Sequence, residues 1–186
     1  MHHRRVFDLK PTLENALVKL RPLAPSDFEP LFAVASDPLI WAQHPTKERY
    51  RREEFTNYFD TGIASGGALL ILDGQGKAIG SSRYYGFDDV ERTVAIGYTF
   101  FARRCWGKGH NQATKALMMS HAFRFVSRIL FHVGRDNKRS RIAMERLGGV
   151  LVGEIEMAYQ GEPRANVNVV YAIERPGADA HDETPR

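Results

Sequence analysis

The stretch RRCWGKGHNQATKALM, residues 103–118, constrains the fold more than any other part of this sequence. Just before it, residues 92–100 (RTVAIGYTF) alternate bulky and small side chains, which is the period of a β-strand. Apolar residues at helical spacing follow it and predict a helix from about residue 108. The side of this helix that faces the core is expected to consist of Ala116, Met119, Phe123 and Val126. A strand therefore leads into a glycine-containing turn that opens a helix in mid-chain.

A turn of this kind is suited to binding an anion. The first N–H groups of a helix have no partner within it, and its N-terminus carries a partial positive charge. Gly107 and Gly109 let the backbone approach a phosphate closely and adopt positive φ angles. Basic groups surround the turn: Arg103, Arg104, Lys108 and His110. The pattern predicts a diphosphate held by backbone N–H groups.

Two better-known phosphate motifs do not fit this turn. A P-loop needs a glycine at the position of Ala102 and Ser or Thr directly after Lys108, where the sequence has Gly109. A dinucleotide fingerprint needs a third glycine at Gln112 and normally follows the first strand of the fold. A glycine pair that merely starts a helix remains an alternative on these residues alone.

The other segments predict a mixed α+β layer rather than a regular βαβ alternation. Ser26 and Glu29 form a capping-box pattern at the start of a first helix. A second helix is expected around residues 55–63, ending near 64–67, and a short one over 137–149 with Asn137 as its N-cap. Strands are expected at 16–23, 68–72, 78–87, 92–100, 128–134, 150–159 and 166–174.

Composition limits the class of protein. A chain of 186 residues with 43% hydrophobic content is expected to form one domain, over residues 16–175, with an N-terminal extension (1–15) and a flexible tail (176–186). No apolar run approaches the ~18 residues of a membrane span, and the start lacks a signal-peptide core, so we expect a soluble, cytoplasmic protein. The lone Cys105 excludes an intrachain disulfide and disfavours structural zinc.

The charge of the chain permits an acidic ligand without identifying one. The formal net charge is +4 and the pI is about 9.3. The basic side chains are spread along the sequence rather than gathered into one stripe, which makes nucleic-acid binding the weakest of the functions considered.

Three segments together resemble a known family. Arg104-x-x-Gly107-x-Gly109 after a strand, with ATKALM behind it, resembles the acetyl-CoA pyrophosphate motif of the GNAT superfamily of N-acetyltransferases. NKRSRIAMERLGG, some thirty residues later, resembles the next motif of that superfamily. The opening KLRPLAPSDFEPLFAVASDPLIWAQHP resembles the ribosomal-protein N-terminal acetyltransferase (RimJ/RimL-like) branch. The resemblance covers about residues 17–174.

The resemblance implies a GNAT-type, mostly antiparallel sheet of six to seven strands, splayed between the fourth and fifth, with about four flanking helices. The pantetheine arm of acetyl-CoA would add at the splay, where a bulge points an N–H at the thioester carbonyl. No metal is implied. For the side chains of Tyr98, Phe100 and Trp106, core packing is the expectation. The implied cofactor-binding residues are Tyr98, Thr99, Phe100, Phe101, Arg104, Trp106, Gly107, Lys108, Gly109, His110, Asn137 and Ser140.

The resemblance also implies catalytic roles. Asn137 would contact the pantetheine amides. Because Met144 stands where many relatives have a tyrosine, Ser140, or a water molecule, would protonate the departing CoA thiolate. The base that takes the proton of the amine is assigned to Glu156. Further candidates for the base are Glu154, His132 and Glu91, and Gly149 departs from the family pattern in a way expected to loosen packing.

The implied reaction is direct transfer of an acetyl group from acetyl-CoA to a primary amine, on a protein N-terminus or a small molecule, in a ternary complex. Trp41, His44 and Arg49 are candidates to contact this acceptor, although Trp41 serves equally well as a loop anchor. No nucleophile for a covalent intermediate is evident. The alternative is a CoA-responsive binding module without turnover. Relatives are often monomers or homodimers, and either state is expected here.

Overall fold

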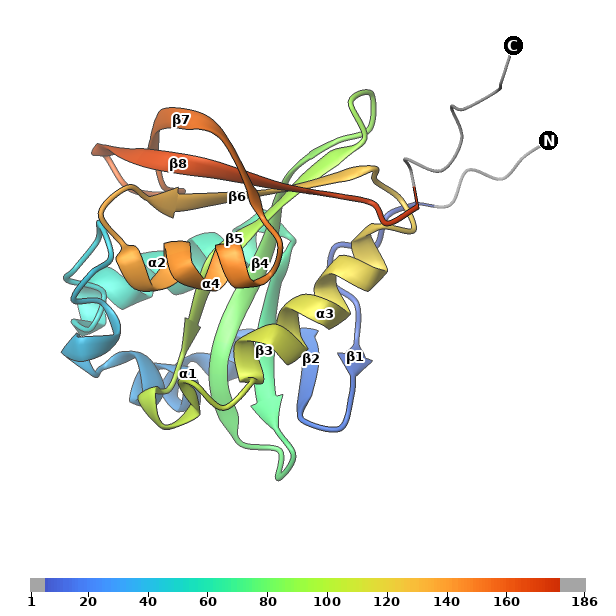
Figure 1. The fold of residues 1–186 in the computed structure, drawn as a ribbon. Helices are drawn as coiled ribbons and strands as arrows, with labels where there is room; N and C mark the ends of the chain where they lie inside the picture. Colours follow the sequence, from blue (N-terminus) through green and yellow to red (C-terminus); the bar gives the residue numbers. More distant parts are fainter. Residues whose placement is uncertain (1–5, 178–186) are drawn as a thin grey trace, which may run out of the picture.

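The computed structural model describes residues 6–177 and consists of one eight-stranded sheet with helices on both faces (Figure 1). The strand order is β1-β2-β3-β4-β5-β6-β8-β7, and β5–β6 is the one parallel pair. The strands are β1 (Leu13–Glu14), β2 (Val18–Pro22), β3 (Ala68–Asp73), β4 (Ala78–Asp88), β5 (Thr93–Phe101), β6 (Arg128–Gly134), β7 (Val150–Ala158) and β8 (Ala165–Glu174). The helices are α1 (Phe28–Ala35), α2 (Arg52–Ser65), α3 (His110–Ala122) and α4 (Lys138–Arg146), with 3-10 turns η1 (Pro25–Asp27), η2 (Pro38–Ile40) and η3 (Arg103–Cys105).

This architecture confirms the mixed, mostly antiparallel sheet with four helices. The eighth strand is β1, a two-residue strand that pairs with β2 and that the sequence pattern did not reveal. It lies in the segment assigned to an N-terminal extension, where Phe7 is also buried in the core. His2 and His3 and most of the expected tail, residues 178–186, lie outside the described residues.

Most helix ends are where their local signals place them. Gly66 ends α2 in the left-handed conformation, at φ 72°, and the Asn137 side chain accepts a hydrogen bond from the Ser140 N–H at the start of α4. The capping box predicted at Ser26 is wrong. The Asp27 carboxylate caps this end of the helix instead, because it accepts a hydrogen bond from the Ala24 N–H at 2.8 Å. Asp27 also forms an ion pair with Arg21.

The buried side of α3 is only partly the one predicted. Met119 and Phe123 pack against the core and Val126 is buried, but Ala116 is exposed. The buried residues of the helix are Thr114, Lys115, Met118, His121 and Ala122. The prediction counted only apolar residues, and Lys115 and Thr114 are polar residues that point inward. A buried lysine cannot be recognised from a hydrophobic pattern, and this one lies close to the site described below.

Two hydrophobic cores lie on opposite faces of the sheet. One contains Met118 of α3 and Met144 of α4, packed against Val94 and Ile96 of β5. The other packs α1 and α2 against the opposite face, largely through aromatic side chains such as Phe55. Figure 1 shows the same arrangement, with α3 and α4 in front of the sheet and α1 and α2 behind it. The helices therefore leave access to the sheet only where the strands themselves separate.

The strands separate between β5 and β6. Their parallel pairing covers only Thr93–Ala95 against Arg128–Leu130, and beyond that point no pairing joins them within the described residues. The splay predicted between the fourth and fifth strands is thus confirmed, at β5 and β6 in the numbering used here. The rest of β5, residues 96–101, presents its backbone edge to the gap.

A β-bulge in β5 alters the side-chain pattern beside this gap. Gly97 pairs with Arg83 and Phe100 with Ser81, so Tyr98 and Thr99 together oppose Ser82. The extra residue reverses the alternation. As a result Phe101, rather than Phe100, shares a core with Val94 and Ile96, contrary to the regular alternation expected over residues 92–100.

Candidate functional site

A cleft of about 830 Å³ opens where β5 and β6 separate. Its floor and walls come from β5 residues 96–101, the turn before α3, β6 residues 131–134 and the first turns of α4. The loop at Gln43 and His44 and the Tyr159 region close the end away from α3. Elements far apart in the sequence thus meet around one space, and the two ends of this space differ in chemistry.

The turn before α3 presents free backbone donors at one end. Gly107 and Gly109 have φ angles of +70° and +88°, in the left-handed region that favours glycine. Within the described residues, no partner accepts from the N–H groups of Gly107, Gly109, His110, Asn111 and Gln112. Gly107, Gly109, Asn111 and Gln112 line the cleft. These free donors lie in the turn where the sequence predicts a diphosphate site, and that site stays a prediction.

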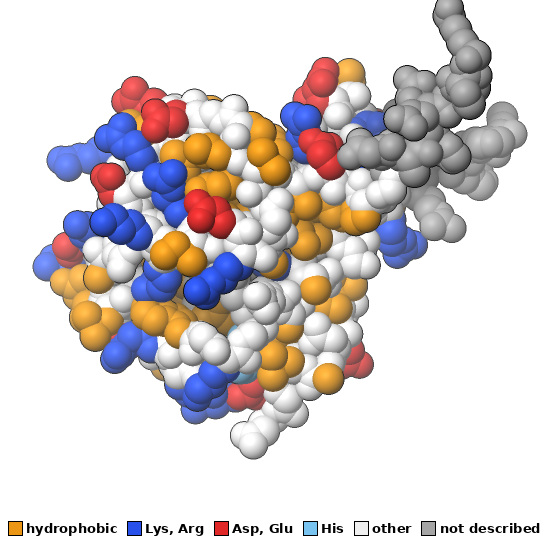
Figure 2. Space-filling view, viewed as in Figure 1, with side chains coloured by type: hydrophobic (Ala, Val, Ile, Leu, Met, Phe, Trp, Pro, Cys, Tyr) orange, Lys and Arg blue, Asp and Glu red, His pale blue; other side chains and the backbone are white. Residues whose placement is uncertain are grey.

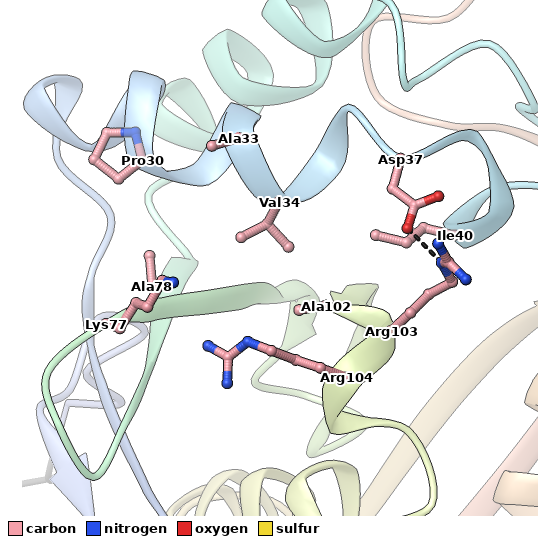
Figure 3. Close-up of a pocket in the computed structure, with 10 residues that line it drawn as sticks. All are labelled: Pro30, Ala33, Val34, Asp37, Ile40, Lys77, Ala78, Ala102, Arg103 and Arg104. Atoms are coloured by element: carbon pink, nitrogen blue, oxygen red, sulfur yellow. Dashed lines mark hydrogen bonds and ion pairs between the residues drawn. The ribbon is translucent and has the colours of Figure 1, made fainter.

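The basic side chains around the turn are placed differently from expectation. Arg103 is paired with Asp37, and Arg104 contacts Asp73 at 3.3 Å. The two arginines diverge from η3 into a separate cavity of about 740 Å³ beside α1 and the β3–β4 hairpin (Figure 3). Their side chains therefore do not add charge at the glycine turn. Lys108 is exposed, and neither it nor His110 lines the cleft.

Other cations line the cleft instead: Arg49, Lys115, Lys138, Arg139 and Arg146. Lys115 on α3 is 4% exposed, and its Nζ donates to Oγ1 of Thr99 at 2.7 Å. Burial lowers the pKa of Lys115 from 10.5 to about 7. Arg139 on α4 lies over the Trp106 ring at 3.8 Å and donates to the Ile40 carbonyl. The positive charge of the cleft thus comes from α3, from α4 and from Arg49 rather than from the glycine turn.

Tyr98 carries the strained backbone of the bulge. Its φ is +54°, which is uncommon for a residue other than glycine. Three contacts hold it: its carbonyl accepts from the Tyr58 hydroxyl, its own hydroxyl accepts from the Gln160 N–H at 2.8 Å, and the Arg83 guanidinium lies 3.9 Å from its ring centre. Strain that is held by several contacts beside a cleft is typical of functional sites.

The α4 residues expected at the site also line the cleft. Asn137 is 5% exposed, and its Oδ1 caps the helix through the Ser140 N–H at 3.3 Å. Ser140 is partly exposed next to it, and Met144 is buried where relatives were expected to have a tyrosine. Gly149 does not loosen the packing as expected. A Cβ there would approach the Met144 carbonyl to 3.0 Å, so the backbones are already close.

The carboxylates proposed as the base lie outside the cleft. Glu156 is exposed on the edge strand β7, and Glu154 and Glu91 are also exposed and absent from the lining. His132 on β6 does line it, and its Nδ1 lies 2.7 Å from the Tyr85 hydroxyl. Burial lowers the pKa of His132 below 6.5, so the imidazole is neutral at pH 7.

The end of the cleft away from the glycine turn contains buried charge among aromatic rings. Arg49 is 2% exposed and is bound to Glu162 at 2.7 Å. Its guanidinium carbon lies 5.0 to 5.9 Å from the centres of the Tyr58, Tyr159, Trp41 and Tyr98 rings. Trp41 is itself buried and donates to the Ala35 carbonyl, so of its two expected roles the structure favours the loop anchor.

Several kinds of site have no residues here to form them. Cys105 is buried, and burial raises the pKa of its thiol, which keeps it protonated at neutral pH. Within residues 6–177, no group of three His, Cys, Asp or Glu side chains is placed to hold a metal ion. Over the same residues, no helix has the length and apolar character needed to cross a bilayer.

Comparison with known proteins agrees with this geometry. The family model described as an acetyltransferase (GNAT) domain matches residues 18–150. This chain belongs to the GNAT acetyltransferase family. A search of curated proteins finds no match.

Solved GNAT structures share the fold at low sequence identity. A probable GNAT-family acetyltransferase from Chromobacterium violaceum has a TM-score of 0.78 at 19% identity, covering 94% of this chain and 92% of its own. The microcin C7 self-immunity acetyltransferase MccE, in complex with acetyl-CoA and AMP, has a TM-score of 0.72 at 16% identity (90% and 99%). RimJ from Mycobacterium smegmatis, in complex with CoA-disulfide, has a TM-score of 0.66 at 19% identity (90% and 85%).

As a GNAT acetyltransferase the protein is an acyltransferase, and acetyl-CoA is the donor that this fold uses. Nine of the residues predicted to bind it line one cleft: Tyr98, Thr99, Phe100, Phe101, Trp106, Gly107, Gly109, Asn137 and Ser140. Arg104, Lys108 and His110 do not. Sequence reasoning missed Lys115, Arg139, Tyr85 and Tyr159, all of which line the cleft. No motif marks them, because each reaches the cleft only through tertiary packing.

Proposed function

We propose that this GNAT acetyltransferase is an N-acetyltransferase that moves the acetyl group of acetyl-CoA directly to a primary amine in a ternary complex. The amine belongs to a protein N-terminus or to a small molecule. The opening segment and the fold shared with RimJ support a place near the RimJ/RimL-like branch. The cytoplasmic location and the choice between monomer and homodimer stay predictions from the sequence.

The observation that carries this proposal is the row of free backbone N–H groups at the mouth of the β5–β6 cleft. Gly107, Gly109, Asn111 and Gln112 present these donors at the start of α3, where the helix dipole favours negative charge. A diphosphate is an anion that such a group of free N–H donors at a helix N-terminus can bind. Lys115 and Arg139 would add positive charge along the cleft, with Lys115 partly protonated near pH 7.

The free edge of β5 is suited to an extended ligand. Its backbone groups beyond Ala95 have no strand partner on the β6 side within the described residues, and a chain with amide groups can pair there as an added strand. Asn137 has its Oδ1 committed to the helix cap, which leaves its side-chain N–H groups for such a chain. Acetyl-CoA supplies the acetyl group as a thioester and its pantetheine arm as that chain.

The reaction requires two proton transfers, and we assign each to a different residue of the cleft. In the reaction a bond forms between the amine nitrogen and the acetyl carbon, and the carbon–sulfur bond breaks. We assign the proton lost by the amine to Nε2 of His132, and the proton gained by the CoA sulfur to the hydroxyl of Ser140. The products are an N-acetyl amide and CoA thiol. His132 then releases its added proton to solvent and the Ser140 oxygen takes one up, so protons and charge balance.

His132 replaces Glu156 in this assignment because of where each residue lies. Glu156 is exposed on β7, whereas His132 lines the cleft and is neutral at pH 7. If its Nδ1–H donates to the Tyr85 hydroxyl, the lone pair on Nε2 is left to accept a proton. Tyr85 is then a positioning residue that fixes the ring and its tautomer.

The proposal is tested by following thiol release from acetyl-CoA with a panel of small amines and short peptides that have free N-termini. We expect acetyl-CoA-dependent thiol release with at least one amine, and an acetylated amine by mass spectrometry. Binding of acetyl-CoA without turnover on any amine would instead support the CoA-responsive module. Failure to bind acetyl-CoA in a calorimetric titration would refute the assignment of the cleft.

A further inference from the structure

The end of the cleft away from the glycine turn, here called the acceptor end, contains two hydrogen-bond donors next to each other. Nη1 of Arg49 and Nε2 of His44 lie 3.5 Å apart, and both residues line the cleft. The Thr46 N–H donates to Nδ1 of His44 at 2.9 Å. A neutral imidazole has one N–H, so the proton of His44 is on Nε2. Arginine nitrogens only donate.

His44 is held in this neutral form. Burial, followed by the charge of Arg49, keeps the pKa of His44 well below its usual range. The two N–H groups therefore cannot satisfy each other, and an oxygen acceptor lying beside both nitrogens would receive both. Two adjacent N–H donors, one of them charged, are a pair with which proteins recognise a carboxylate.

The only carboxylate at this end is already engaged, as far as residues 6–177 show. Oε1 of Glu162 accepts from Nε and Nη2 of Arg49, and its Oε2 accepts from the Thr46 hydroxyl at 2.7 Å. These bonds use the side of the guanidinium opposite to His44. Glu162 thus fixes the orientation of Arg49 and leaves Nη1 available.

A second buried arginine leaves this end with excess positive charge. Arg83 is 1% exposed and its Nε is buried with no partner among the described residues. Its Nη groups donate to neutral oxygens, on Gln160 and on the Tyr58 backbone, and no carboxylate of residues 6–177 pairs with it. Burial lowers the pKa of Arg83, and the charge of Arg49 acts in the same direction. Of the two buried guanidiniums, only that of Arg49 is thus balanced by a carboxylate, and the surroundings are mostly aromatic rings.

We infer that the acceptor of this enzyme is a primary amine that also carries a carboxylate, bound by Nη1 of Arg49 and Nε2 of His44. The inference rests on the proposed function. The carboxylate belongs either to a free amino acid or to an acidic residue at the N-terminus of a peptide. A negatively charged group is the partner that two converging donors and an uncompensated buried charge both favour.

The test compares amines that differ only in this carboxylate. Thiol release is measured with free amino acids against their amides, and with peptides that begin with Asp against the same peptides with Asn. The same pairs are titrated calorimetrically into the protein in the presence of CoA. We expect kcat/KM and affinity to favour the carboxylate by at least about tenfold, the usual effect of hydrogen bonds to a charged group.

Three variants locate the recognition. The double variant Arg49→Met with Glu162→Gln removes the guanidinium without leaving a buried charge unpaired, and should reduce the preference to about unity. Glu162→Gln alone is its matched control and should keep the preference or raise it, because Arg49 remains. His44→Asn keeps an acceptor for the Thr46 N–H and loses the Nε2 donor, so the preference should fall several-fold.

The outcomes separate this inference from the proposed function. Equal rates and equal binding within every pair would overturn the inference while acetyl transfer stands. A preference that survives in the double variant and in His44→Asn would overturn it as well. Selective binding of carboxylates without turnover would support it and refute the proposed function. A preference confined to free amino acids, or to peptides, supports it and identifies the source of the carboxylate.

Discussion

Replacing Lys115 by methionine should stabilise the protein, and the gain should depend on pH in a defined way. Lys115 is 4% exposed, its only hydrogen bond among the described residues is to Thr99, and burial lowers its pKa from 10.5 to about 7. Between these two values the unfolded chain holds the proton that the folded chain has lost. Stability therefore rises with pH in this window, because the unfolded state binds more protons.

The magnitude follows from the same pKa. Each pH unit between 7 and 10.5 changes the free energy of unfolding by roughly 1.4 kcal/mol, or about 5 kcal/mol over the window. Below pH 7 both states are protonated and the dependence vanishes. Lys115→Met has no such proton, so its advantage over the natural chain should be largest at or below pH 7 and should shrink steadily toward pH 10.5.

The assay is urea unfolding of both proteins at several pH values from 6 to 9.5, with the difference in the free energy of unfolding plotted against pH. Contributions from other titrating groups cancel in this difference. Lys19→Met, on the exposed side of β2, controls for the loss of one positive charge. A difference that is flat across the range, or that grows with pH, would show that Lys115 is not held in the desolvated position described here.

The remaining predictions concern the cofactor and the two proton transfers. Gly107→Asp should abolish acetyl-CoA binding by calorimetry, because it puts a negative charge and a side chain where phosphate is expected. Gly76→Asp, at a positive-φ glycine in the β3–β4 turn, should bind normally, and equal affinities for the two variants would contradict the assignment. Ser140→Ala should lower kcat by about 100-fold with little change in affinity for acetyl-CoA. An unchanged kcat would show that Ser140 is not the general acid. His132→Gln should reduce the slope of log kcat/KM for the amine against pH from about 2 to about 1 at saturating acetyl-CoA, at pH values below the lowered pKa of His132, because only the amine then has to lose a proton. A slope that stays the same would remove His132 as the base.

The sequence predicted those features of the fold that depend on short stretches of chain. The glycine turn, the Asn137 cap and the hairpin of β3 and β4 each follow from a few adjacent residues. The splay was predicted through family resemblance and not from spacing. Even so, the regular alternation of β5 was misread, because the bulge at Tyr98 depends on its pairing with Ser82.

The charged parts of the site were beyond sequence reasoning for a related reason. Arg49 and Glu162 are 113 residues apart, and nothing local in either segment marks them as partners. Lys115 and Arg83 are buried, and no sequence pattern marked them, since lysine and arginine are rarely buried. Arg104 belongs to a motif and was expected at the phosphate turn, but its side chain contacts Asp73 instead.

A space-filling view shows basic side chains scattered among apolar and acidic ones on the face that carries α4 (Figure 2).

Tyr98 joins the two ends of the cleft into one structure. Its backbone forms the bulge on the cofactor side, while the contacts that hold its positive φ come from Tyr58, Gln160 and Arg83 at the acceptor end. The strain of that backbone, on the order of 1–3 kcal/mol, persists only while those contacts are made. Arg83, which has no carboxylate partner among residues 6–177, therefore has two roles under the proposed acceptor site, since it contacts the ring of Tyr98 and would add positive charge beside an anionic acceptor. An apolar side chain in its place could contact the ring but would supply no charge.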